Sequence, residues 1–177
     1  MLPSLVTEVT LLKYHPRIMP YEPDLAGPGP VKKVGFLWFR HSYPKGKIQP
    51  LVFERLVALV EKPLGYYCGY HKCNLGSCAL TEGLRGQPTF RNGGRLLGLG
   101  SSEIFVPAED AIYHAPNLIL HYIRQHRYQP PECFCAAVLK CPEPDSAEYR
   151  ERLTRLAPDL AKFFYTSHAP EGKPDPA

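Results

Sequence analysis

The stretch SEIFVPAEDAIYHAPNLILHYIRQ, residues 102–125, contains the change from strand to helix that defines the fold class of this chain. Its first part, Ser102-Glu103-Ile104-Phe105-Val106, is short, apolar and stopped by Pro107, which is typical of a strand. Its last part predicts a helix from about Pro116 to Gln125. The expected buried face of that helix has four apolar members: Leu118, Ile119, Tyr122 and Ile123.

Towards the N-terminus the patterns predict more short strands and one helix. An alternation of apolar and polar residues from Leu5 to Leu11 suits a strand, and Val34-Gly35-Phe36-Leu37-Trp38-Phe39 predicts a second, buried one. A helix is expected over residues 50–61, because Pro50 suits a first position and the apolar residues recur at helical spacing. The pair Asn92-Gly93 indicates a hairpin turn.

Beyond residue 125 the chain predicts helices. One is expected from Pro131 to about Lys140, and another opens at Asp145, where Asp145 and Glu148 have the spacing of a capping box. Pro158 is expected to break this last helix. With a few short strands in the N-terminal part and about four short helices, most of them after residue 110, the fold class is α+β.

Composition limits the size and class of the protein. The 177 residues suit one domain of ~100–200 residues, expected over residues 1–165, with residues 166–177 forming a disordered Pro-rich tail. Proline occurs 20 times, roughly twice the usual ~5%, so short elements and irregular Pro-rich loops are expected. A net charge of +4 without a dense Lys/Arg run gives no support for nucleic-acid binding.

The expected location is the cytoplasm. The first residues lack the pattern of a signal peptide, and no apolar run approaches the ~18 residues of a membrane span. Thiols stay reduced in the cytoplasm, so the six cysteines favour metal binding or free thiols over disulfides.

The segment Gly69-Tyr70-His71-Lys72-Cys73-Asn74-Leu75-Gly76-Ser77-Cys78 carries the clearest chemistry. Thiolate sulfur and imidazole nitrogen are ligands that zinc prefers, so His71, Cys73 and Cys78 are candidate ligands of a zinc ion, Zn2+. Two alternatives stay open. The cysteines can be inert buried residues, or they can form a redox pair, although Cys-x4-Cys lacks the helix-start geometry that lowers a thiol pKa.

A closed structural zinc site needs four ligands, so one more has to come from elsewhere. The helix predicted after Pro116 is the nearest rich source of histidines, and His121 is the first choice, with His114 second. His126, five residues beyond His121, is not expected to share its face. Cys133, Cys135 and Cys141 are interpreted as small apolar residues, because positions i and i+2 of a helix diverge.

Two signatures resemble an uncharacterised family of bacterial proteins. One is the aromatic-Gly-x-His-x-Cys segment with a further Cys, here through Cys78. The other is Ala115-Pro116-Asn117-Leu118-Ile119-Leu120-His121-Tyr122-Ile123, followed by His126-Arg127-Tyr128-Gln129-Pro130-Pro131 and Phe134. The resemblance spans roughly residues 65–140 and implies a fold and the position of a metal site, but no reaction.

Two functions are compatible with these residues. The first is a small non-enzymatic protein whose structural zinc ties the Cys-containing loop to a helix, and which acts by binding another protein as an immunity, regulatory or adaptor protein. The alternative is a zinc-dependent hydrolase with three protein ligands, a water in the fourth position, and Glu103 or Glu109 as base. The identity of the fourth ligand separates the two.

Overall fold

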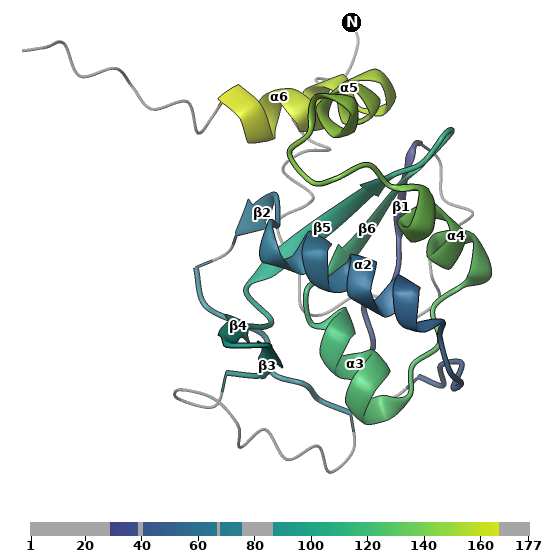
Figure 1. Ribbon diagram of the computed structural model, residues 1–177, viewed down its shortest axis with the longest axis vertical. Helices are drawn as coiled ribbons and strands as arrows, with labels where there is room; N and C mark the ends of the chain where they lie inside the picture. Colours follow the sequence, from purple (N-terminus) through teal and green to yellow (C-terminus); the bar gives the residue numbers. More distant parts are fainter. Residues whose placement is uncertain (1–28, 39–40, 67, 76–86, 167–177) are drawn as a thin grey trace, which may run out of the picture.

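The computed structural model describes residues 29–38, 41–66, 68–75 and 87–166, which form a single compact α+β fold (Figure 1). The strand expected near Leu5 and the tail after residue 166 lie outside the described residues. The described strands are β1 (Val31–Lys33), β2 (Gly65–Tyr66), β3 (Thr89–Asn92), β4 (Arg95–Gly98), β5 (Ser102–Pro107) and β6 (Ile112–Pro116). The described helices are α2 (Pro50–Glu61), α3 (Ile119–His126), α4 (Glu132–Lys140), α5 (Ala147–Leu156) and α6 (Pro158–Thr166).

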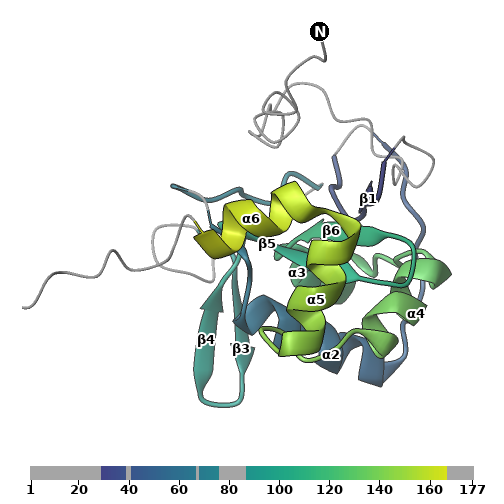
Figure 2. The ribbon, with the colours of Figure 1, turned by 90° about the horizontal axis from the view of Figure 1, so that it is seen from above.

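The central sheet has four strands in the order β1-β6-β5-β2. β6 is antiparallel to β5 and parallel to β1, and the short β2 pairs antiparallel with β5. β3 and β4 form a separate hairpin, which projects from one side of the molecule in Figure 2. Its turn contains Gly93 with φ of +55°, so the turn predicted from Asn92-Gly93 is confirmed.

Both faces of the sheet are covered, which explains why every residue of β5 is buried. Neighbouring residues on a strand point to opposite faces. Tyr113 therefore meets Phe134 of α4 on one face, at 5.8 Å between ring centroids, whereas His114 stacks on Phe105 on the other, at 4.7 Å. The ring of Phe105 also meets Phe164 of α6. The sheet thus lies between α4 and α6 in three layers.

The expected strand over residues 34–39 is wrong in its position. The strand is Val31–Lys33, and residues 34–38 follow it without regular structure. Gly35 explains the break, since its φ of +77° lies in the left-handed region that favours glycine, and a Cβ there would lie 3.0 Å from Ile119 Cδ1. Val34 and Leu37 of this run are buried in the core, although the run does not form a strand.

The region before α3 also differs from expectation. Residues 112–116 form β6, so Pro116 ends a strand and α3 begins three residues later, at Ile119. The predicted helices over residues 50–61 and 131–140 are confirmed as α2 and α4, and the strand from Ser102 is confirmed as β5. Pro158 separates α5 from α6, as expected, which gives five helices in the described part of the chain.

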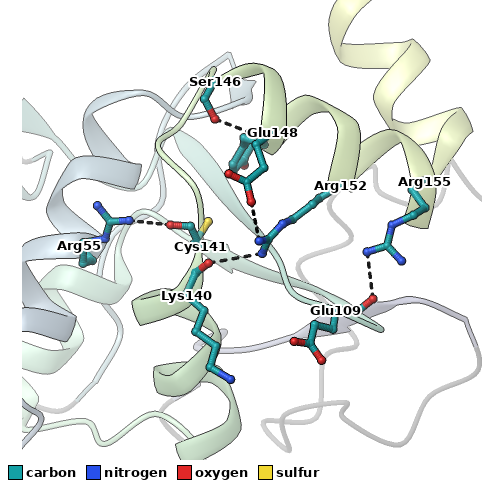
Figure 3. Close-up of polar contacts among 9 residues, drawn as sticks. Arg55, Glu109, Lys140, Cys141, Ser146, Glu148, Arg152 and Arg155 are labelled. Atoms are coloured by element: carbon teal, nitrogen blue, oxygen red, sulfur yellow. Dashed lines mark hydrogen bonds and ion pairs between the residues drawn. The ribbon is translucent and has the colours of Figure 1, made fainter.

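α5 begins one residue later than the proposed capping box. Asp145 has φ of +68° and cannot act as the N-cap, whereas the Ser146 hydroxyl accepts a hydrogen bond from the Tyr149 amide at 3.1 Å. Figure 3 shows how the helix is anchored: Arg152 donates to Glu148 at 2.6 Å and to the Lys140 carbonyl at 3.4 Å.

The cap on α5 gives a first prediction. Ser146→Ala removes the oxygen that accepts the Tyr149 amide, so the free energy of unfolding should fall by about 1 kcal/mol. Glu151→Ala, at an exposed position of the same helix, should change it by less than ~0.5 kcal/mol. Urea unfolding measures both. Equal urea midpoints for the two variants would show that Ser146 does not cap the helix.

Candidate metal centre

Three side chains from two distant parts of the sequence, one in the loop before residue 76 and two on α3, lie close together. Cys73, His121 and His126 each offer one ligand atom, and these atoms all lie within 4.8 Å of one another. Cys73 Sγ is 3.2 Å from His126 Nε2, and the centroids of the two imidazole rings are 5.2 Å apart. One thiol and two imidazoles at this separation could hold a metal ion.

The loop that carries Cys73 is fixed to the rest of the fold by its backbone. The His71 amide donates to the Gly100 carbonyl at 2.8 Å. Gly100 is required there, because its φ is +86° and a Cβ would lie 2.2 Å from the His71 carbonyl oxygen. The Leu75 amide also points at Cys73 Sγ, at 3.4 Å. The sulfur therefore lies in a defined position and is buried, with only 5% of the residue exposed.

The side chain of Asn117 holds the Gly100 backbone in place through three hydrogen bonds to the surrounding chain. Its side-chain oxygen accepts from the Gly100 amide at 2.6 Å, and its amide nitrogen donates to Ser102 Oγ at 2.7 Å and to the Gly98 carbonyl at 3.1 Å. This buried amide joins the start of α3 to the chain between β4 and β5. The role of Asn117 was not predicted from the sequence. Its position directly after Pro116 and just before a helix, where Asn side chains often bond to the backbone, was the available signal.

The expectation that His126 cannot share the face of His121 is wrong. The two residues are 140° apart around an ideal helix. However, α3 ends at His126, and Arg127 follows with φ of +55°. The two rings nevertheless approach each other, with 5.2 Å between their centroids, and both lie within reach of Cys73.

Burial favours the neutral form of both imidazoles by lowering the pKa of each. Desolvation, with a smaller contribution from His126, lowers the pKa of His121 to about 4. Desolvation, with a smaller contribution from Lys45, also lowers the pKa of His126. A metal ion binds the neutral imidazole, so neither histidine has to lose a proton to become a ligand near pH 7.

The other predicted ligands lie as follows. His71 is not part of the cluster; desolvation lowers the pKa of its half-buried imidazole, against an opposing effect of Glu103. Cys78 lies outside the described residues. His114, the second choice for a helical ligand, lies in β6 and not on a helix, and its Nε2 is paired with the Glu103 carboxylate inside the core.

The described cysteines outside the cluster do not gather into a second site with three ligands. Cys68 and Cys133 are exposed, Cys135 is half-buried, and Cys141 is buried. None of the five described cysteines forms a disulfide. Burial raises the pKa of Cys141 to about 12, so its unreactive thiol form persists at neutral pH.

Thiol labelling should separate these residues. Treatment of the folded protein with iodoacetamide at pH 8 should modify Cys133 rapidly and leave Cys141 unmodified, because alkylation requires an accessible thiolate. Peptide mass spectrometry measures the extent of labelling at each cysteine, and unfolding in urea should make the two extents equal. Comparable labelling of the two thiols in the folded protein would contradict the burial of Cys141.

A pocket of about 550 Å³ adjoins the cluster. It lies between α3 and the β3–β4 hairpin, and His121 forms part of its wall. His121 therefore belongs both to the group of ligand atoms and to the lining of the pocket.

Fold and site together define an α+β protein with a Cys-His-His cluster able to hold a metal ion. The chain belongs to a family defined by a domain of unknown function, DUF7919, whose model matches residues 13–139. That span contains all three cluster residues and ends within α4. No curated protein and no solved structure matches the chain. None of the described helices is long and apolar enough to cross a membrane.

Proposed function

We propose that the protein binds one zinc ion through Cys73, Cys78, His121 and His126, and that this ion has a structural role. The meeting of Cys73 with His121 and His126 is the observation that supports this most directly. The spacing supports it as well: Cys-x4-Cys followed by His-x4-His falls within the C-x2–4-C and H-x3–5-H ranges typical of structural zinc sites.

The chemistry of the donors favours zinc over harder ions. Thiolate and imidazole are suited to zinc, whereas magnesium and calcium require oxygen ligands. In this proposal His126 takes the place that the sequence motif suggested for His71. Cys78, five residues after Cys73 in the sequence, is proposed as the fourth ligand, which closes the site and leaves no position for a reacting water.

The structural role follows from where the ligands come from. The ion joins the loop of Cys73 to the end of α3, two segments that are about 50 residues apart in the sequence. The proposal extends to a non-enzymatic, cytoplasmic protein that acts by binding another protein. A zinc site with two thiolates requires reduced cysteines, which the cytoplasm maintains.

Replacing each histidine in turn tests the ligand set. His126→Gln should weaken zinc binding by more than ~100-fold, because even residues that only orient ligands cost ~10–100-fold. His71→Gln should leave the affinity nearly unchanged, which makes it the matched control. Competition with a chromogenic chelator measures both affinities. The proposed ligand set is excluded if His71→Gln releases zinc and His126→Gln retains it.

Cobalt substitution tests the role of Cys78. Bound to two thiolates and two imidazoles, Co2+ should give the intense visible absorption of a tetrahedral site and a thiolate charge-transfer band. Cys78→Ser should reduce the charge-transfer intensity by about half and weaken binding. An unchanged spectrum would show that Cys78 is not a ligand.

The pocket beside His121 favours one alternative, a hydrolase with three protein ligands and a water on the metal. Its proposed bases are poorly placed, since Glu103 is buried against His114 and Glu109 lies in the exposed turn between β5 and β6. Retention of zinc by Cys78→Ser, with a water-like fourth ligand, would favour this alternative.

A further inference from the structure

The pocket between α3 and the β3–β4 hairpin has the dimensions of a small-molecule site. Its volume of about 550 Å³ lies within the ~300–1,000 Å³ typical of ligand pockets. Residues of four segments line it: β3, β4, the chain just after β4, and α3. It is therefore a feature of the folded protein and does not arise from any one element.

The inner wall of the pocket is apolar. Phe90 of β3 and the exposed Leu96 of β4 line it, and the buried Leu99 and Leu120 lie behind them as part of the core. Phe90 also meets Phe53 of α2, at 5.6 Å between ring centroids, so its ring is held in place from behind. This wall offers a rigid apolar surface to the body of a ligand.

The rim of the pocket is positively charged. Arg91 of β3 and Arg124 of α3 both line it, and the lining residues in the described part of the chain include no carboxylate. The guanidinium carbon of Arg124 lies 5.2 Å from the centroid of the Phe90 ring, which stacks this cation on the apolar wall. A cationic group thus lies directly beside the apolar surface.

We infer that this pocket binds a small organic anion. The guanidinium group of Arg124 receives the anionic head, a carboxylate or a phosphate, and Arg91 adds positive charge to the lining. Phe90 and the exposed Leu96 contact the apolar body. The inference rests on the pocket alone and not on the metal. His121 links the two sites, because it contributes to the wall of the pocket and to the metal cluster.

Titration calorimetry with three probes of one shape tests this inference. Phenyl phosphate and benzoate carry an anionic head on a phenyl ring, and benzyl alcohol is their neutral counterpart. At least one anion should bind saturably to the protein as purified, at least ~10-fold more tightly than benzyl alcohol. The difference between the two anions identifies the preferred head group. Equal affinity for benzyl alcohol, or no saturable binding of either anion, would overturn the inference.

Two variants locate the binding. Arg124→Ala should weaken binding of the preferred anion by roughly 10- to 100-fold, as expected for a lost hydrogen bond to a charged group. Arg95→Ala is the matched control, because Arg95 is an exposed cation of the same hairpin that lies 3.9 Å from Glu61 and does not line the pocket. An equal loss in both variants would show non-specific attraction and overturn the assignment.

The same samples separate the anion site from the metal site. Zinc content and thermal unfolding are measured on each variant before calorimetry. Arg124→Ala should keep its zinc content and its thermal stability but lose affinity for the anion. If Arg124→Ala unfolds early, Arg91→Ala replaces it, because Arg91 is exposed on β3 and also lines the pocket. If the folded variants keep full affinity for the anion, the proposed role of the arginines is overturned.

Discussion

Replacing Cys73 by serine is expected to remove the bound zinc and to lower the free energy of unfolding by at least about 3 kcal/mol. Zinc binds the folded protein and finds no assembled site in the unfolded chain, so its binding energy adds to stability. Serine keeps the size of the side chain but replaces the thiolate by a poor zinc ligand. Zinc content and urea unfolding of the same sample measure the two effects.

Cys133→Ser is the matched control for this prediction. It makes the same change of sulfur to oxygen at an exposed position of α4, so the zinc content should be unchanged and the free energy of unfolding should stay within ~0.5 kcal/mol of that of the parent protein. A Cys73→Ser protein that keeps its zinc would exclude the thiol as a ligand. A protein that loses zinc but unfolds at the same urea concentration would show that the ion has no structural role.

Removing the carboxylate of Glu103 is the second change with a large expected effect. Glu103 pairs with His114 in the core, where the two residues are 7% and 2% exposed. Glu103→Ala leaves the His114 Nε2 buried without its partner, and an unpaired buried polar group costs about 1–3 kcal/mol. The imidazole stacks on Phe105 and cannot turn to water without disturbing that contact.

Urea unfolding of Glu103→Ala checks the size of this effect. Glu109→Ala, in the exposed turn after β5, is the control and should change the free energy of unfolding by less than ~0.5 kcal/mol. Similar midpoints for the two variants would show that the pair contributes little to stability. Zinc content should be unchanged in folded Glu103→Ala, because neither member of the pair belongs to the metal cluster.

The elements with strong local patterns were predictable from the sequence. α2 has apolar residues at helical spacing with Pro50 at its start, and β5 is a short apolar run stopped by Pro107. β6 was missed because Ile112-Tyr113-His114 resembles the start of the helix that follows, and its pairing with β5 is a tertiary property. β1 was misplaced because the left-handed conformation of Gly35 cannot be inferred from an apolar run.

The metal cluster was predictable only in part, for the same reason. Cys73 could be singled out by its residue type and spacing, and His121 by its place beside the apolar face of a helix. His126 was excluded by ideal helical geometry, which does not hold at the last residue of a helix. The pocket had no sequence signal, since it forms only where the β3–β4 hairpin approaches α3.

Elemental analysis of protein purified without a histidine tag or chelator tests the central claim most directly. The proposed ligand set predicts about one zinc per chain, with no other metal near that ratio. The zinc should remain after dialysis and should leave in parallel with unfolding when a strong chelator is added. Protein that is fully folded, with reduced thiols and no stoichiometric metal, would contradict the claim that Cys73, His121 and His126 form a zinc site.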